Sequence, residues 1–240
     1  EVYSKPIESG EEIASQALKT RIRPFVLRRL KRDVAPELPP LTEVVLRCPM
    51  PDPQREVYKV VHQAAKVAIQ ENKEIKTLQV LEHLLRLRQA ACHPSLLPGD
   101  QPGVSGKTDL LIRKINQIVE KGHKALIFSQ WTGFLDLIAS EIETNGHEYL
   151  RLDGGTRDRQ SAVQDFQREG GPPLFLISLK AGGTGLNLTA ADYVFIVDPW
   201  WNPAVESQAT DRAHRIGQKK PVIAIRLISE DSVEERIMAL

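Results

Sequence analysis

Cysteine is scarce in this sequence, and its scarcity limits the sites that the chain can hold. Only Cys48 and Cys92 occur among the 240 residues, and they do not form a Cys-x-x-Cys pair. A structural zinc site usually takes closely spaced thiolates, so the sequence argues against one. So few cysteines also fit a reducing compartment.

Long apolar runs and an excess of charge are missing as well. No segment approaches ~18 consecutive apolar residues and no signal peptide opens the chain, so we expect a soluble, intracellular protein without membrane contact. The formal net charge is +1, which means that nucleic-acid binding would have to come from local basic patches. The chain starts at Glu1 without an initiator Met, which suggests an excised fragment.

The sequence does contain an alternation of apolar strands and amphipathic helices. Hydrophobic residues make up 41% and charged residues 26% of the chain, as in globular proteins. In the C-terminal part the alternation predicts an α/β fold, with a parallel sheet of about five strands, right-handed crossovers and helices on both faces. The predicted strands are Ala125–Ser129, Tyr149–Leu152, Leu174–Leu179, Tyr193–Val197 and one at Val222, and the predicted helices run to Lys121, over Gly133–Asn145 and over Arg157–Gln167.

The N-terminal part is predicted to be mainly helical. A short helix is indicated over Glu11–Lys19, a run of six basic residues lies within Arg21–Arg32, and Val44–Cys48 has the pattern of a short strand. Apolar residues at helical spacing over Gln54–Gln70 and Leu78–Ala91 predict a helical hairpin. The predicted domains are a basic joining segment (residues 1–50), the hairpin (51–97) and the sheet domain (98–240).

A glycine-rich turn follows the predicted strand Leu174–Leu179. The segment Ala181–Gly185 holds three glycines and does not match the Gly-x-Gly-x-x-Gly dinucleotide pattern. Bare backbone N–H groups there could point at an anion. A tight strand-to-helix turn explains the same spacing, and both interpretations stay open.

The next predicted strand ends at Asp198, where a magnesium-binding carboxylate could stand. Pro199 follows instead of a second acidic residue, so we favour a role for Asp198 in bracing the following turn. Trp200 and Trp201 come next, in a loop at the edge where open α/β sheets bind ligands. Packing of one ring is the default, and exposed stacking is the alternative.

A helix is predicted from Pro203, with Gln208, Asp211, Arg212 and Arg215 along one side. A solvated, salt-bridged face is the ordinary explanation for such a pattern. Beside the glycine-rich turn, however, two arginines on one stripe are suited to neutralising charge that develops on a γ-phosphate.

The tripeptide Gly106-Lys107-Thr108 ends like a Walker A motif but does not complete one. That motif requires a glycine where Gln101 stands, and no strand precedes the segment. We interpret it as the N-terminal cap of a helix.

Two segments make a family resemblance specific. Gln208–Gln218 (QATDRAHRIGQ) resembles motif VI of the Swi/Snf-type ATPases of helicase superfamily 2, and Lys180–Leu188 (KAGGTGLNL) resembles their motif V. Pro24–Val34 is similar to the segment that joins the two motor lobes of that family, and Leu87–Pro94 to its helical insertion.

The resemblance implies the second of two RecA-like lobes. ATP and Mg²⁺ would lie between the lobes, with most ligands in a first lobe absent from this chain and no metal ligand here. Arg212 and Arg215 would act as arginine fingers beside Gln208 and Asp211. The nucleotide contacts that the resemblance implies are Gly183, Gly185 and Gln218.

The resemblance implies that the protein binds double-stranded DNA and moves along it. The implied DNA contacts are Ser129, Gln130, Trp131, Asp153, Gly154, Thr156, Lys180, Ala181, Gly182, Thr184, Trp200, Trp201, Asn202, Arg28 and Arg29. Further implied partners are the first lobe of the same polypeptide and a DNA-bound protein as cargo. The expected location is the cytoplasm or nucleoid of a prokaryote or the nucleus of a eukaryote.

The expected activity is DNA-stimulated ATP hydrolysis that drives translocation, with the fragment alone inactive. A stand-alone nucleic-acid or protein interaction module remains an alternative, because no Walker A lobe is present. A small-molecule nucleotide enzyme is disfavoured, because the sequence offers neither a catalytic acid–base pair nor a dinucleotide-binding turn.

Overall fold

The computed structural model describes residues 2–26, 35–71, 77–99, 103–181 and 185–238. It separates into two compact units, Glu1–Leu38 and Pro39–Leu240. The first unit contains α1 (Ser4–Glu8) and α2 (Glu12–Ile22), neither of which buries a residue. Helix α2 confirms the helix predicted near Glu11–Lys19, whereas α1 was not predicted.

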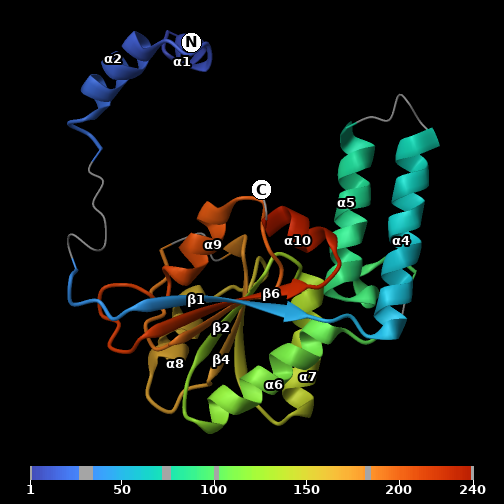
Figure 1. Cartoon of the computed structure of the whole chain (residues 1–240). Helices are drawn as coiled ribbons and strands as arrows, with labels where there is room; N and C mark the ends of the chain where they lie inside the picture. Colours follow the sequence, from blue (N-terminus) through green and yellow to red (C-terminus); the bar gives the residue numbers. More distant parts are fainter. Residues whose placement is uncertain (1, 27–34, 72–76, 100–102, 182–184, 239–240) are drawn as a thin grey trace. The chain divides into compact units, whose positions relative to one another are not determined.

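The second unit is built on one parallel sheet (Figure 1). Six strands lie in the order β1-β6-β5-β2-β4-β3, and every neighbouring pair is parallel. The strands are β1 (Leu41–Cys48), β2 (Ala125–Ser129), β3 (Tyr149–Leu152), β4 (Leu174–Ser178), β5 (Tyr193–Ile196) and β6 (Val222–Ser229).

The predicted count of about five strands is corrected to six. The additional strand is β1, which confirms the strand predicted over Val44–Cys48 and begins three residues earlier. The sequence analysis did not assign this strand to the sheet, where it pairs along its whole length with β6. That pairing joins segments far apart in the sequence, so no local pattern indicates it. Strand β1 lies at the sheet edge and is only partly buried, which explains its mixed apolar and polar sequence.

Helices cover both faces of the sheet, as predicted. Along β2, Ile127 packs in a cluster with residues of α6 (Gly106–Glu120) and α7 (Thr132–Thr144). Its neighbour Phe128 packs in a second cluster with residues of α8 (Arg159–Gln167) and α9 (Pro203–Thr210). Successive strand residues point to opposite faces, and both faces here are buried, which explains the continuous apolar runs of β2 and β4.

The helical hairpin consists of α4 (Asp52–Glu71) and α5 (Thr77–Cys92), and a short 3₁₀ helix, η1 (Pro94–Leu96), follows. Buried Gln54 anchors the hairpin, because its Nε2 donates to the carbonyl oxygens of Ala90 (3.1 Å) and Ala91 (3.0 Å). Its Oε1 accepts from the Gly106 amide at 3.1 Å, so one side chain ties α4, α5 and α6 together.

The Gly106-Lys107-Thr108 segment is a helix start, as we interpreted it. The Ser105 hydroxyl accepts from the Thr108 amide and caps α6. A Cβ atom at Gly106 would stand 2.0 Å from the Pro49 carbonyl oxygen, so the glycine is required by packing. Within the described residues, no helix combines the length and apolarity needed to cross a membrane.

Candidate nucleotide and nucleic-acid interface

The loops expected to bind ligands begin at one edge of the sheet. Ser129 at the end of β2 is in register with Ser178 at the end of β4, and Phe128 is in register with Ile196 at the end of β5. Strands β3 and β4 are likewise paired up to Leu152 and Ile177. Since all of these strands are parallel, the following loops emerge side by side.

The arginine-bearing segment is not helical throughout, which corrects the predicted spacing. Helix α9 ends at Thr210, and turns replace the helix beyond it, so Asp211, Arg212 and Arg215 do not form a helical stripe with Gln208. Beyond the helix end the backbone bonds to another segment, because the Leu188 amide donates to the Arg212 carbonyl oxygen at 3.0 Å.

The structure nevertheless brings the two predicted motifs together. The Arg215 Nη1 donates to the carbonyl oxygen of Gly185 at 3.3 Å. Gly185 has a φ of +46°, so the described end of the glycine-rich turn adopts the left-handed conformation that glycine permits. Gln208, Gly185 and Arg215 are exposed, whereas Arg212 is only 8% exposed.

The electrostatics of the arginine pair fit a phosphate group. Burial, and then the positive charge of Arg215, lower the pKa of Arg212, and the nearby Asp211 carboxylate opposes the shift. The Arg212 Nε is buried and has no hydrogen-bond partner among the described residues. The buried Nε does not itself face the exterior, so any contact of Arg212 with a ligand would use the rest of its guanidinium group.

Gln218 was predicted to contact the nucleotide, but its side chain is buried and hydrogen-bonded to the protein itself. Its Nε2 donates to the carbonyl oxygens of Thr189, Ala191 and Ala213 at 3.1, 2.8 and 3.1 Å. Its Oε1 accepts from two successive backbone amides, at 2.8 and 2.9 Å. The geometry thus gives Gln218 the role of joining the two motif segments.

Asp198 has a bracing role, but it braces the loop after β2 and not the turn that follows Asp198, which corrects the expectation. Its carboxylate accepts from the Gln130 amide and from the Ser129 hydroxyl, each at 3.2 Å. Burial raises its pKa to about 7, although Lys107 and Arg88 lower it. Ser129 is fully buried, so its hydroxyl is part of this bracing and does not face the exterior.

The loop after β3 is stabilised by its own side chains. The Asp153 carboxylate accepts from the Gly155 amide at 2.8 Å, and the Thr156 hydroxyl accepts from the Asp153 amide at 2.9 Å. The Gly155 hydrogen bond and the Arg151 guanidinium lower the pKa of Asp153, although burial opposes the shift. Gly154 and Gly155 are exposed residues of this loop.

The tryptophans pack around a residue that the sequence analysis did not select. Arg88 of α5 is 3% exposed, and its guanidinium carbon lies 5.9, 5.5 and 5.2 Å from the ring centroids of Trp131, Trp200 and Trp201. Trp201 is still 44% exposed. Only the outer part of these rings therefore remains exposed for stacking against a ligand.

The remaining predicted contacts divide into two groups. Lys180 is exposed, Ala181 is buried, and exposed Asn202 caps α9 by accepting from the Ala204 amide at 3.0 Å. The other predicted contacts lie outside the described residues: Arg28, Arg29, Gly182, Gly183 and Thr184.

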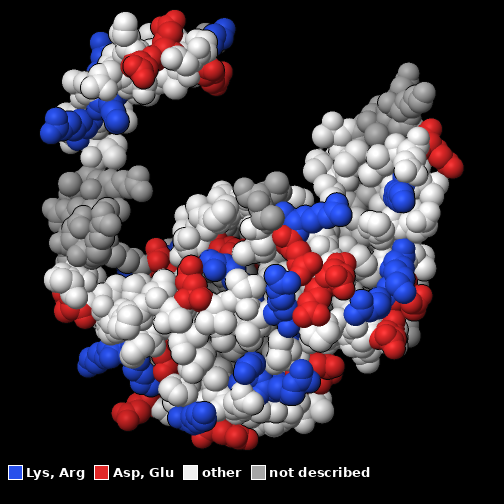
Figure 2. Space-filling view, in the orientation of Figure 1, with Lys and Arg blue, Asp and Glu red and all other residues white. Residues whose placement is uncertain are grey.

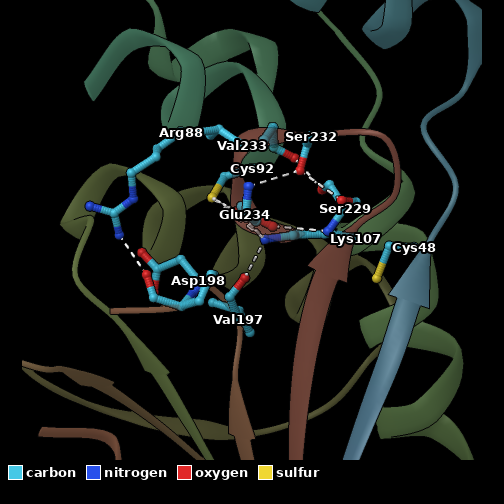
Figure 3. Close-up of polar contacts among 12 residues, drawn as sticks. Cys48, Arg88, Cys92, Lys107, Val197, Asp198, Ser229, Ser232, Val233 and Glu234 are labelled. Carbon is cyan, nitrogen blue, oxygen red and sulfur yellow. Dashed lines mark hydrogen bonds and ion pairs between the residues drawn. The ribbon is translucent and has the colours of Figure 1, made fainter. Parts of the chain in front are cut away.

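A buried ionic network lies behind this edge (Figure 3). The Lys107 Nζ lies 2.6 Å from Glu234 Oε1 and donates to the Val197 carbonyl oxygen at 2.9 Å. Burial alone would lower the pKa of Lys107, but the surrounding negative groups, Glu234 among them, raise it above its usual value. Lys107 is consequently held in the interior and is not available to bind phosphate.

Charges on the visible surface of the second unit are interspersed (Figure 2). Among the described residues, the face that this view shows carries no broad basic patch. The described residues contain no group of three or more histidine, cysteine or acidic side chains that could hold a metal ion.

A six-stranded parallel sheet with helices on both faces is the architecture of a helicase-type RecA-like lobe. The arginine-bearing segment lies toward the amino edge of this sheet, where His214 Nε2 contacts the Pro39 carbonyl oxygen just before β1 at 2.8 Å. Residues 106–217 match the family model described as the helicase conserved C-terminal domain, and residues 1–96 match the SNF2-related domain. The chain belongs to the SNF2 family of ATPases, within helicase superfamily 2.

Two solved structures and one curated relative illustrate the similarity. The Sulfolobus solfataricus SWI2/SNF2 ATPase C-terminal domain is 31% identical, with a TM-score of 0.69 and coverage of 83% of this chain and 84% of that one. The ATPase core of the same name in complex with dsDNA is 34% identical, with a TM-score of 0.73 and coverage of 100% and 52%.

The curated relative is the SWI/SNF-related matrix-associated actin-dependent regulator of chromatin subfamily A member 1 of Homo sapiens. It is 37% identical over an alignment of 243 positions, and the alignment includes 95% of this chain. The chain spans 23% of the length of that relative.

Proposed function

We propose that this chain is the second motor lobe of a DNA-dependent ATPase that translocates on double-stranded DNA and remodels or displaces DNA-bound protein. The observation that carries the proposal is the pair Arg212 and Arg215. Both lie against the segment after β4: Arg215 Nη1 donates to the Gly185 carbonyl oxygen at 3.3 Å, and the Arg212 carbonyl oxygen accepts from the Leu188 amide at 3.0 Å. Family membership supports the same reading.

In this proposal the arginines serve an ATP molecule held mainly by the first lobe of the same polypeptide. Mg²⁺, with most of its ligands in that lobe, would neutralise phosphate charge. Arg212 and Arg215 would reach across the interface and stabilise negative charge on the γ-phosphate in the transition state. Arg212 is buried, whereas Arg215 is exposed and can reach a partner.

The DNA track is proposed to run along the loops at the carboxyl edge of the sheet. Exposed Lys180, Gly154 and Asn202 offer a cationic group, a bare backbone and an amide. Such groups suit sequence-independent contact with phosphates. The similar SWI2/SNF2 core solved with dsDNA supports this assignment. We accordingly place the protein at DNA, in a nucleus or a nucleoid.

The burial of Lys107 favours a second candidate function for the isolated chain. A lysine in a Gly-Lys-Thr segment would be the obvious phosphate ligand, but this one is paired inside the protein with Glu234. Without a phosphate-binding lysine the chain alone would act as a nucleic-acid or protein interaction module that does not hydrolyse ATP.

The deciding experiment compares ATP turnover by the 240-residue chain and by the full-length protein, each with and without double-stranded DNA at low, fixed salt. We expect turnover only in the full-length protein, and faster turnover with DNA. Turnover by the chain alone would contradict the half-motor assignment. If neither protein hydrolyses ATP under any condition, the interaction module replaces the motor.

A further inference from the structure

Arg88 lies at the meeting point of the helical hairpin and two edge loops. The chain has three tryptophans, and the rings of all three lie within 5.9 Å of its guanidinium carbon. Trp131 belongs to the loop after β2, and Trp200 and Trp201 belong to the loop after β5. One side chain of α5 thus contacts both loops.

A direct hydrogen bond fixes Arg88 to the second loop. Its Nη2 donates to the Pro199 carbonyl oxygen at 2.6 Å. Within the described residues Arg88 forms no salt bridge and its Nε has no partner, although it is 3% exposed. A buried cation without a bound carboxylate is costly, and the aromatic faces, the Pro199 carbonyl oxygen and the nearby Asp198 carboxylate, whose pKa Arg88 lowers, together offset its lost hydration.

The loop after β5 is also held from the opposite side. Glu206 of α9 accepts from the Trp200 amide at 2.8 Å through Oε1, and its Oε2 accepts from Arg226 Nε at 2.7 Å. Pro199 and Trp200 are therefore held between Arg88 and the Glu206–Arg226 pair. A loop fixed at two successive residues can move only together with the elements that hold it.

The first loop is joined to the same assembly through Asp198. This carboxylate binds the Gln130 amide and the Ser129 hydroxyl, and it immediately precedes Pro199 in the chain. A displacement of Arg88 would therefore reach both loops, through Trp131 and through the Asp198–Pro199 segment. Lysine could not replace it fully, because a planar guanidinium can stack on rings while it donates in its own plane.

We propose that Arg88 is a positioning residue that couples the helical hairpin to the two DNA-facing loops. The proposal rests on the function proposed above, because the loops matter only if they contact DNA. Loss of Arg88 would leave ATP binding intact but let the loops move independently of the hairpin. Hydrolysis would then be less effectively converted into movement along DNA.

The arrangement itself can be tested on the 240-residue chain, because its three tryptophans all lie around Arg88 and supply all the tryptophan fluorescence. Arg88→Met should increase quenching of this fluorescence by acrylamide, whereas Arg86→Met should not. Arg86 is the matched control: it lies on the same helix, is 34% exposed and binds Gln89 and Glu82. Equal quenching in Arg88→Met and wild type would overturn the proposal.

Coupling is tested in the full-length protein by measuring ATP turnover and third-strand displacement from a DNA triplex under the same conditions. Arg88→Met should lower displacement per ATP about tenfold, the scale of one lost hydrogen bond to a charged group, and change the KM for ATP less than about twofold. Arg86→Met should match the wild type. A merely structural defect would lower turnover and displacement in proportion.

The outcomes separate the two proposals. Wild-type protein without DNA-stimulated turnover would overturn the motor function and the role of Arg88 with it. An active wild type with unchanged coupling in Arg88→Met would overturn only the role of Arg88. If Arg88→Met does not fold, Arg88→Lys takes its place, with partial loss of coupling expected and wild-type coupling counting against the proposal.

Discussion

The Lys107 ammonium group and the Glu234 carboxylate form an ion pair in the protein interior, with side chains 0% and 1% exposed and 2.6 Å between Nζ and Oε1. The pair joins α6 to the C-terminal helix α10 (Val233–Met238). Glu234 Oε2 also accepts from the Ser229 amide at 2.9 Å, so the pair fixes the end of β6 as well.

Lys107→Met should destabilise the protein strongly, because it leaves the Glu234 carboxylate buried and unpaired. We expect a loss of about 3–5 kcal/mol in the free energy of unfolding, measured by urea titration. Lys59→Met is the control: its ion pair with Glu56 is 63% and 68% exposed, so a change below about 1 kcal/mol is expected. A similarly small change for Lys107→Met would show that the buried pair contributes little.

Arg215→Ala should abolish most DNA-stimulated ATP hydrolysis in the full-length protein. An arginine finger contributes roughly 10³–10⁵ in kcat, and a loss of that order is expected in steady-state turnover with saturating DNA. Arg113→Ala, a change at an exposed position of α6, should retain wild-type turnover. Full activity of Arg215→Ala would exclude the catalytic role.

Local patterns were sufficient to predict much of the fold. The apolar run of β4 has no polar alternation because both sheet faces are covered, and that pattern is visible in the sequence. The start of α6 was similarly predictable, because the missing Walker glycine left a helix start as the simpler interpretation of Gly106 and Lys107, although the capping residue is Ser105.

Features that depend on distant contacts were not predictable. The sequence analysis extended the helix after Pro203 beyond its observed end at Thr210. The backbone hydrogen bond between Leu188 and Arg212, just beyond that end, joins two separate segments and leaves no local pattern in the sequence. Arg88 looked like any charged residue of an amphipathic helix, since only the folded chain brings the three tryptophans around it. The partners of Gln218 are likewise visible only in three dimensions.

Asp198 should make stability depend on pH in an identifiable way. Its pKa is about 7 in the folded protein but ~3.9 in an unfolded chain, so between these values the folded state holds the extra proton. The free energy of unfolding should therefore fall as pH rises through this window, by up to about 1.4 kcal/mol per pH unit.

Asp198→Asn removes the titrating group and should remove this contribution. Urea titrations from about pH 5 to about pH 8 would show wild type losing stability relative to the variant as pH rises. Asp165→Asn, at a carboxylate that is 50% exposed, should keep the wild-type slope. Parallel curves for wild type and Asp198→Asn would mean that Asp198 stays ionised throughout.

Gln218→Ala separates a structural role from a nucleotide contact. The side chain makes five hydrogen bonds to the backbone, and its loss leaves buried groups unpaired. We expect a destabilisation of about 1–3 kcal/mol in urea titrations and a KM for ATP within about twofold of wild type in the full-length protein. Gln160→Ala, at an exposed position of α8, should change neither. A large rise in the KM for ATP without loss of stability would instead establish the nucleotide contact that the sequence motif predicts. The loss of a side chain that only joins two protein segments would not raise the KM for ATP in a protein of unchanged stability.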